Sequence, residues 1–397
     1  MRIIVYDNSG HPFTVQLSRT LANKEHQILH LFSQSFQSPK GSFEKKGDDS
    51  STLEIKGISL LKPFNKYSFY ERWIQEREFG RLVSTEIESF QPDVLISCNV
   101  PIDTQKYVLN ACKKCNAQFI FWVQDFYGIA IKKIMTNKFY FLGRLIGSYY
   151  VYQEKRLLKQ SDKIILISED FKDILNIWKV RSSNIFSIPN WAPIQEIPVE
   201  KKINNWSQSN ALHDKFCFIY SGTLGLKHNP ELLIELAKEF RQNENVKIVV
   251  VSEGIGADWL KKKKVELDLQ NIVLLDFQPF EVLPKVLGTA DVLISILEED
   301  AGIYSVPSKV LSYLCAKKAL LLAVPKENQA AKIVNQFKMG LVSSPNELSK
   351  FIDNAKLLYK NKILRTTLGT NSRNYAEKYF NIEDITNQFI NIIKNKE

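Results

Sequence analysis

Two short segments of this chain carry the residue types that hold phosphate groups in proteins. The first runs from Tyr220 to Pro230 and contains Gly222, Gly225 and Lys227 between an apolar run and an amphipathic one. Glycine lets the backbone turn tightly and approach a ligand closely, and lysine adds a positive charge, so we expect this loop to face a phosphate. The same residues would also suit an ordinary glycine-containing turn.

The second segment, Tyr304 to Leu314, places Pro307, Ser308 and Lys309 at the start of a helical pattern. Proline fits the first turn of a helix, and the free amides of that turn attract anions. This pattern predicts a phosphate contact that needs no metal ion. The alternative is a plain helix start whose lysine is solvated.

Weaker signals follow two other apolar runs of the second half. Gly254 and Gln278 each come just after such a run, where a nucleoside would bind, although simple loops read the same way. The chain has no GxGxxG, GxxxxGK[ST], Asp-x-Asp or HExxH motif. Dinucleotide oxidoreductases, P-loop ATPases, metal-bridged diphosphate sites and zinc hydrolases are therefore disfavoured.

In the first half, Gly10, His11 and Phe13 join the first apolar run to the first helical pattern. Asp125 follows another apolar run, 119–123. A carboxylate at the end of a parallel strand could position an acceptor hydroxyl or accept its proton. It could equally cap the next segment.

Residues 126–160 mix many basic and aromatic residues with a single acid, Glu154. That mixture is typical of an interfacial membrane patch, where each basic residue near anionic lipid contributes ~1 kcal/mol. Nucleic-acid binding uses the same residue types, but no DNA- or RNA-binding motif accompanies them. A solvated face with some buried aromatics is the other interpretation. The basic residues are Lys132, Lys133, Lys138, Arg144, Lys155, Arg156 and Lys159.

The elements that must position these residues alternate along most of the chain. A length of 397 residues suits two or three domains, and 44% hydrophobic with 24% charged residues is ordinary for a globular protein. Apolar runs without polar alternation predict parallel strands covered on both faces, and helical patterns between them predict doubly wound α/β domains. Residues 190–215 interrupt the alternation and read as a linker. We expect strands at 2–6, 27–32, 93–97, 119–123 and 163–168, then at 216–221, 246–252, 272–276, 291–296 and 319–324, with three helices at the end.

Charge and segment composition indicate where such a chain would work. The net charge of +10 favours anionic partners. No stretch reaches the ~18 apolar residues of a membrane span, and the first residues turn polar too quickly for a signal peptide. We therefore expect a cytoplasmic protein with reduced cysteines, in which Cys112 and Cys115 share a helix face rather than a zinc site.

The two phosphate-type segments resemble those of glycosyltransferase family 4, above all the branch that makes O-antigen, capsule and colanic-acid sugars, including fucosaminyl transferases. The resemblance extends over essentially the whole chain, through Trp122 to Asp125, Glu154-Lys155-Arg156, 188–191 and 307–314. It implies the GT-B fold, an α/β architecture of two Rossmann-like domains whose parallel sheets face each other across a cleft. The implied parts are an acceptor-binding domain at 1–191, a linker at 192–214, a nucleotide-sugar-binding domain at 215–380 and a helix at 381–397 that returns to the first domain.

The resemblance also implies a reaction and a set of site residues. It implies transfer with retention of the anomeric configuration, without metal or other cofactor, from a nucleotide diphosphate sugar (UDP favoured over GDP). The sugar could be an N-acetylated deoxyhexosamine such as FucNAc, and the acceptor an undecaprenyl-diphosphate-linked saccharide at the inner face of the cytoplasmic membrane. The implied catalytic residues are Asp125, Lys227 and Lys309, and the acceptor side holds Gly10, His11 and Phe13. The implied donor-binding residues are Gly222, Thr223, Gly225, Gly254, Gln278, Ser305, Val306, Ser308 and Ser312.

Some positions depart from the family pattern, and two rival functions stay open. Tyr304 and Ser312 stand where many members carry glutamates, and Thr223 stands where a basic residue is frequent. A nucleotide-sugar 2-epimerase on the same fold would convert its donor without any acceptor. A non-catalytic binding subunit would show no thermal stabilisation by UDP or GDP.

Overall fold

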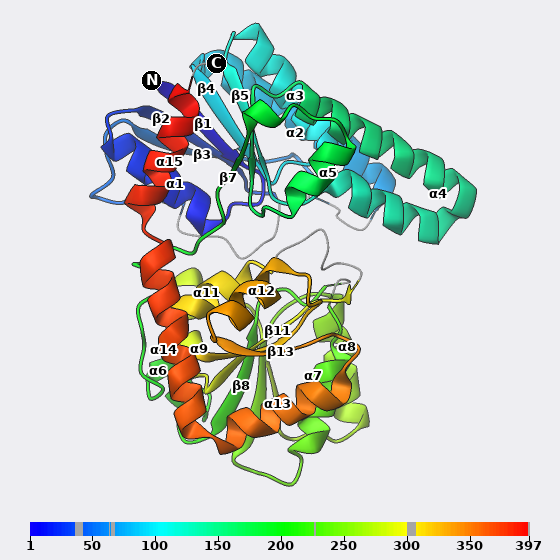
Figure 1. Ribbon diagram of the computed structural model, residues 1–397, viewed down its shortest axis with the longest axis vertical. Helices are drawn as coiled ribbons and strands as arrows, with labels where there is room; N and C mark the ends of the chain where they lie inside the picture. The colour runs from blue at the N-terminus through cyan, green and yellow to red at the C-terminus, as the bar shows by residue number, and fades with distance from the viewer. Residues whose placement is uncertain (36–42, 63, 65–67, 226–227, 300–306, 396–397) are drawn as a thin grey trace. The chain divides into compact units, whose positions relative to one another are not determined.

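The chain divides into two compact units in the computed structural model, which describes residues 1–35, 43–62, 64, 68–225, 228–299 and 307–395. Unit 1 comprises Met1–Asn190 with Ile382–Glu397, and unit 2 comprises Trp191–Asn381. Each is a parallel sheet flanked by helices (Figure 1). The predicted doubly wound α/β architecture with two parallel sheets is therefore confirmed.

Unit 1 is built on a seven-stranded sheet in the order β3-β2-β1-β4-β5-β6-β7, with every pairing parallel. Its inner strands are buried along nearly their whole length, as continuous apolar runs such as Ile3-Ile4-Val5 require. The strands are β1 (Arg2–Asp7), β2 (Gln27–Ser33), β3 (Leu53–Ile58), β4 (Val94–Cys98), β5 (Gln118–Val123), β6 (Lys163–Leu166) and β7 (Ile185–Ser187).

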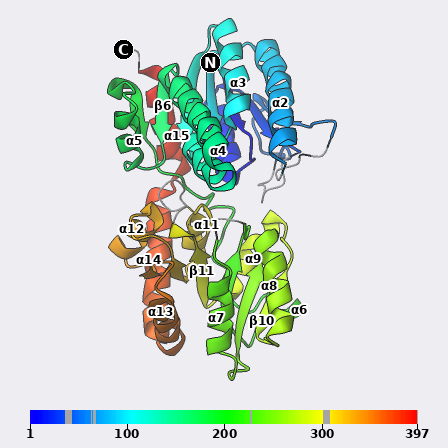
Figure 2. The ribbon, with the colours of Figure 1, turned by 90° about the vertical axis from the view of Figure 1, so that its right-hand side faces the viewer.

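The helices of unit 1 cover both faces of this sheet. In Figure 2, α2, α3 and α4 stand together on one face, whereas α1 packs beside α15. The helices are α1 (Pro12–Asn23), α2 (Phe69–Phe90), α3 (Ile102–Lys114), α4 (Tyr127–Lys159), α5 (Phe171–Ile177), the 3-10 turn η1 (Ser182–Asn184) and α15 (Ile382–Lys394).

The last helix, α15, is held to unit 1 by both apolar and polar contacts. Phe389 packs edge-on against Trp122, with ring centroids 4.9 Å apart. The buried ammonium of Lys163 on β6 donates hydrogen bonds to carbonyl oxygens of Ile392, Ile393 and Asn395 at the helix end. A lysine there satisfies carbonyls that a helix terminus leaves without partners.

Unit 2 repeats the architecture with a six-stranded parallel sheet in the order β10-β9-β8-β11-β12-β13. Its strands are β8 (Phe216–Ser221), β9 (Val246–Val251), β10 (Ile272–Leu275), β11 (Val292–Ile296), β12 (Ala319–Ala323) and β13 (Gly340–Ser343). Its described helices are α6 (Asn205–Ser209), α7 (Glu231–Glu239), α8 (Ile255–Glu266), η2 (Phe280–Val282), α9 (Leu283–Thr289), α11 (Lys309–Cys315), α12 (Gln329–Gln336), α13 (Leu348–Lys360) and α14 (Lys362–Tyr379).

Both sheets reverse their strand order beside their first strand, between β1 and β4 and between β8 and β11. Connections leave in opposite directions at such a point, so a crevice opens beyond the carboxyl ends of the two strands. The residues following β1, β4, β8 and β11 therefore stand where ligands bind in sheets of this kind.

The predicted linker, 192–214, lies with unit 2 and includes α6. Within that unit, Arg373 on α14 donates a hydrogen bond of 3.3 Å to the carbonyl oxygen of Ile197. The predicted domain boundaries otherwise stay predictions. The strands β3, β7 and β13 were not predicted from the sequence.

Candidate functional site

Two glycine-containing loops interlock at the carboxyl edge of the unit 2 sheet. Gly222 follows β8 with φ +130°, and Gly254 follows β9 with φ +109°, conformations that favour glycine. The amide of Gly256 donates to the carbonyl oxygen of Leu224 at 2.9 Å, and the amide of Leu224 donates to Glu253 at 3.3 Å. The first turn of α8 is thereby fixed against the loop that follows β8.

Lys309, the first residue of α11, reaches across to the Gly222 turn. Its Nζ donates a hydrogen bond to the hydroxyl of Tyr220 and lies 3.7 Å from the centroid of that ring. It also lies 3.5 Å from the carbonyl oxygen of Thr223. A Cβ atom on Gly222 would sit 3.1 Å from Lys309 Cε, so the turn leaves just enough room for the lysine stem. Because α11 has only seven residues, the ammonium group is the stronger source of positive potential here.

Tyr313 fills the point where β8 and β11 separate, a role that the sequence patterns did not reveal. The two strands pair only at Val292 and Leu293, below the end of β8. The buried Tyr313 hydroxyl accepts a hydrogen bond from Ser221 N–H at 2.8 Å and donates one to the Ser221 carbonyl oxygen at 2.9 Å. It therefore satisfies backbone groups that the splayed strands leave open, and it keeps the crevice from closing.

The other predicted donor residues lie in different surroundings. Gln278 accepts a hydrogen bond from the Trp206 indole at 3.2 Å and donates to the Asp276 carbonyl oxygen at 3.0 Å. The amide of Gly225 donates to His228 Nδ1 at 3.0 Å. Thr223 and Ser308 are exposed, and Ser312 is half-buried on α11. Three predicted residues lie outside the described residues, namely Lys227, Ser305 and Val306.

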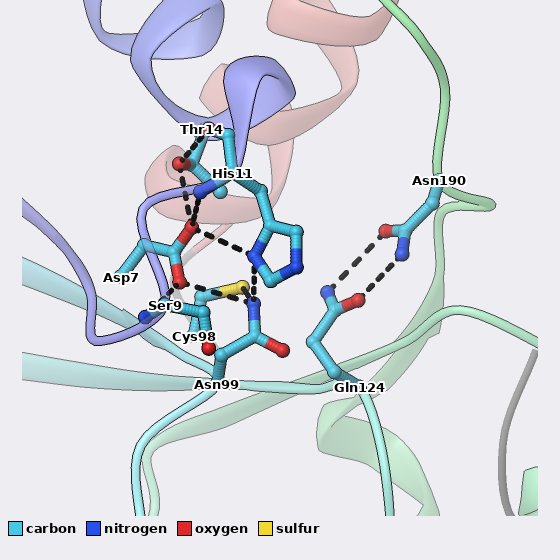
Figure 3. A network of polar contacts seen from close by, with 8 residues as sticks. All are labelled: Asp7, Ser9, His11, Thr14, Cys98, Asn99, Gln124 and Asn190. Carbon is cyan, nitrogen blue, oxygen red and sulfur yellow. Dashed lines mark hydrogen bonds and ion pairs between the residues drawn. The ribbon is translucent and has the colours of Figure 1, made fainter. Parts of the chain in front are cut away.

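In unit 1, the crevice between β1 and β4 is organised around the fully buried carboxylate of Asp7 (Figure 3). The His11 amide donates to Asp7 Oδ2 at 2.6 Å, and His11 Nδ1 lies 3.2 Å from the same oxygen. Further hydrogen bonds come from the Ser9 amide at 3.0 Å, the Thr14 hydroxyl at 2.9 Å and Asn99 Nδ2 at 3.1 Å. The carboxylate thus holds the loop after β1, the start of α1 and the end of β4 together.

The hydrogen bonds and charge around Asp7 keep it ionised. Burial alone would raise the pKa of this carboxyl, but the charge of His11 and the hydrogen bonds from His11 and Thr14 outweigh burial and lower the pKa. Because Nδ1 of His11 faces Asp7, its other ring nitrogen, Nε2, is the one turned away from the carboxylate (Figure 3). This is the arrangement in which a carboxylate fixes the tautomer of a histidine.

The structure places the predicted Gly10, His11 and Phe13 together at the start of α1. Gly10 has φ +72°, which lets the chain turn from β1 into the helix. Phe13 is buried and packs edge-on against Trp122, with ring centroids 5.5 Å apart. Its side chain is therefore part of the unit 1 core, and His11 is the partly exposed member of the three.

Asp125 lies directly after β5, beside other titratable groups of unit 1. Burial is the main cause of the raised pKa of the Cys98 thiol, and the negative charges of Asp7 and Asp125 raise this pKa further. The neighbouring Gln124 side chain forms a paired amide contact with Asn190 (Figure 3). This pair ties the end of β5 to the segment that follows β7, so Asp125 is held on a braced strand end.

In the part of the chain that the structure describes, neither a metal-binding cluster nor a membrane-spanning helix is found. No group of three or more histidine, cysteine, aspartate or glutamate side chains in that part of the chain is arranged to hold a metal ion. None of the helices found there combines the length and the apolar character that crossing a membrane requires.

Comparison with known proteins relates the chain to one family. Residues 202–375 match the family Glycosyl transferases group 1. Over 245 residues the chain is 23% identical to a protein of Escherichia coli (strain K12) named as a colanic acid biosynthesis glycosyl transferase, WcaI. That match covers 61% of this chain and 59% of the relative, so it spans little more than half of the relative's length.

Solved structures share the fold over nearly the whole chain. Sucrose-phosphate synthase from Thermosynechococcus elongatus is similar with a TM-score of 0.74 and 14% identity, covering 99% of this chain and 98% of that one. Anabaena Alr3699/HepE in complex with UDP-glucose is similar with a TM-score of 0.69 and 13% identity, covering 98% of each chain. The two parallel sheets therefore follow the GT-B fold of glycosyltransferases.

Proposed function

We infer that this chain, whose residues 202–375 match the family Glycosyl transferases group 1, is a glycosyltransferase of polysaccharide synthesis. The proposed reaction moves a sugar from a nucleoside diphosphate onto a saccharide acceptor. One observation carries the proposal, namely the Lys309 ammonium poised over the Gly222 turn at the crevice of the unit 2 sheet. A cation beside a glycine turn suits a ligand that carries a diphosphate.

In the proposed donor site, the diphosphate accepts hydrogen bonds from the loop after β8 and lies against Lys309. The bond between the anomeric carbon and the phosphate oxygen breaks, and the oxygen keeps the electron pair. Lys309 then stabilises the charge that develops on this oxygen, an effect of ~3 kcal/mol for one well-placed donor. We propose UDP as the nucleotide, supported by the fold that this chain shares with the UDP-glucose complex of HepE.

In the proposed acceptor site, unit 1 positions the attacking hydroxyl with His11 or Asp125 at the carboxyl ends of β1 and β5. The new bond joins the acceptor oxygen to the anomeric carbon. The proposed outcome is retention without a metal ion, in which a phosphate oxygen of the leaving group takes the proton.

The proposed substrates follow from the relatives in polysaccharide synthesis and from residues 126–160. We propose an undecaprenyl-diphosphate-linked saccharide as acceptor, and an N-acetylated deoxyhexosamine such as FucNAc as one candidate sugar. Such an acceptor is anchored in a membrane, so the chain would work at the inner membrane face. The basic and aromatic residues of 126–160 support attachment to anionic lipid there.

The decisive variant is Lys309→Ala. With a panel of nucleotide sugars and a lipid-linked monosaccharide, we expect its turnover to fall by roughly 100-fold, the effect of losing one stabilising donor. Lys360→Ala is the matched control, because this lysine is exposed at the end of α13. Near-normal turnover in Lys309→Ala would remove the lysine from the donor site. Conversion of the donor without acceptor would instead indicate an epimerase.

A further inference from the structure

The long helix α4 is a hairpin of two antiparallel arms (Figure 1). A Cβ atom on Gly147 would collide with the Cα atom of Lys132, and one on Gly128 would sit 2.9 Å from the Cα atom of Val151. Near the bend, a Cβ atom on Gly143 would collide with the backbone of Met135. All three pairs are centred on residues 139–140, where the helical dihedral angles break. Glycines therefore let the two arms touch backbone to backbone.

The tip of this hairpin, Phe139–Leu142, consists of four large apolar side chains that the fold leaves exposed. Their exposed fractions are 49% for Phe139, 88% for Tyr140, 70% for Phe141 and 65% for Leu142. An exposed apolar cluster of this size marks an interaction site more often than a neutral surface. Folding alone gives no reason to place four such residues at a turn.

Tyr140 adds a second argument for a functional tip. Its backbone has φ +45° and ψ −110°, a region in which glycine is favoured and a bulky residue is strained. Its ring is almost fully exposed, so packing against the described part of the chain does not offset this strain. Retaining a tyrosine here is understandable if the ring contacts something outside the chain.

The arms of the hairpin define the charge of that partner. Residues 126–160 hold seven lysines and arginines and one acid, Glu154. Glu154 is buried and accepts a hydrogen bond of 3.0 Å from the Gly128 amide at the base of the hairpin. The exposed charge of the hairpin is therefore positive, and Lys138 and Arg144 are exposed on either side of the tip.

We propose that the hairpin tip, Phe139–Leu142, inserts its apolar side chains into an anionic lipid bilayer while the basic residues of the arms bind the headgroups. This rests on the membrane attachment in the proposed function and names the segment that enters the lipid. The shorter arm, residues 127–138, limits how far the hairpin can reach. Its 12 residues are about 18 Å long, less than the ~30 Å hydrocarbon core, so the tip reaches the acyl boundary without crossing the bilayer. The apolar tip matches the acyl-chain layer of such a bilayer, and the basic residues on either side match its anionic headgroup layer.

Vesicle binding by tip variants of the full chain tests this proposal. Sedimentation would compare vesicles of phosphatidylcholine alone with vesicles that also contain phosphatidylglycerol. We expect the unchanged chain to bind only the anionic vesicles. Phe141→Ser is expected to bind at least about tenfold more weakly, the loss expected for one inserted aromatic ring. Ile363→Ser on α14, which removes a side chain of 81% exposure in unit 2, is the matched control and should bind normally.

Tyr140→Gly separates insertion from damage to the fold. Because glycine relieves the strained backbone, we expect its thermal midpoint to equal or exceed that of the unchanged chain, while its lipid binding falls about tenfold. Normal vesicle binding by both tip variants would overturn the insertion, and so would a dimer that forms through the tip without vesicle binding.

Transfer to a soluble acceptor separates the inserted tip from the proposed reaction. We expect both tip variants to transfer the sugar to a short water-soluble saccharide at normal rates. If the chain performs this transfer but binds no vesicle, the tip proposal fails and the glycosyltransferase proposal stands. If it binds vesicles through the tip but transfers no sugar, the glycosyltransferase proposal fails and the tip proposal stands.

Discussion

Replacing Glu154 by glutamine should change how the stability of unit 1 depends on pH. Glu154 lies at the base of the α4 hairpin with only 1% of its surface exposed. Burial raises the pKa of this carboxyl from 4.5 to about 8, although hydrogen bonds from the Gly128 and Tyr127 amides act in the opposite direction and the charge of Asp125 raises it further. The folded chain therefore holds the proton of Glu154 more tightly than the unfolded chain does.

The sign and size of the effect follow from this difference. A carboxyl whose pKa is raised by folding stabilises the folded state fully below the unfolded pKa, near 4.5, and this stabilisation is lost as the pH rises to about 8. At 1.36 kcal/mol for each factor of ten in proton affinity, the loss between pH 4.5 and pH 8 is on the order of 5 kcal/mol. A neutral glutamine of the same shape does not titrate, so Glu154→Gln should not suffer this loss.

Thermal unfolding of the two proteins between pH 4.5 and pH 9 measures the difference. We expect nearly equal midpoints at pH 4.5, and at pH 9 a midpoint for unit 1 that is higher in Glu154→Gln by about 10 °C. Glu244→Gln, which changes an exposed carboxyl in unit 2, is the control and should leave the pH dependence of unit 1 unchanged. Parallel pH curves for Glu154→Gln and the unchanged chain would refute the reasoning.

Two further predictions concern unit 1. Asp7→Asn should lower kcat about 100-fold, because the amide no longer fixes the His11 ring that positions the acceptor hydroxyl, whereas thermal stabilisation by UDP should stay unchanged, and normal turnover would contradict the role assigned to Asp7. Lys163→Met should remove the hydrogen bonds that hold the end of α15. Amide hydrogen exchange of residues 382–394 should then accelerate, while exchange in the unit 2 sheet stays unchanged. Equal protection of residues 382–394 in the variant and the unchanged chain would contradict the role assigned to this lysine.

Most of the architecture could be predicted because parallel strands buried on both faces leave a strong apolar signal. Ile164-Ile165-Leu166 and Val249-Val250-Val251 are runs of this kind, and both are strands. The edge strand β3, Leu53–Ile58, is buried only at its two ends and includes Glu54 and Lys56, so it lacks the continuous apolar run of the inner strands. The strands β7 and β13 have three and four residues, too few for periodicity to show.

The candidate site could be predicted only where the chain itself marks it. Glycines at positive φ, such as Gly222 and Gly254, leave a trace in the sequence, because other residues are strained there. Tyr313 leaves none, because its hydroxyl acts through backbone groups of Ser221, 92 positions away. Asp7 was likewise missed, since an aspartate that ends an apolar run reads as an ordinary strand terminus.

The hairpin of α4 could not be predicted from residue composition. The basic and aromatic content of 126–160 indicated a surface, but not that the segment folds back on itself at Phe139 and Tyr140. That bend depends on three glycines whose spacing matters only once two arms pair. The pattern of a single helix does not show which glycines of the two arms will face each other.

The crevices of the two sheets differ in charge in a way that suits two different substrates. In unit 2 the ordered group is a cation, Lys309, beside a glycine turn that leaves backbone room for a ligand. In unit 1 it is a buried carboxylate, Asp7, whose negative charge faces a histidine rather than the crevice itself. A cation attracts a diphosphate, whereas a histidine oriented by a carboxylate is suited to hydrogen-bond a neutral hydroxyl and hold it for attack. Exchanging the roles would set the Asp7 carboxylate against the diphosphate charge and leave the acceptor hydroxyl without the histidine that positions it. The charges therefore assign the donor to unit 2 and the acceptor to unit 1 in the proposed reaction.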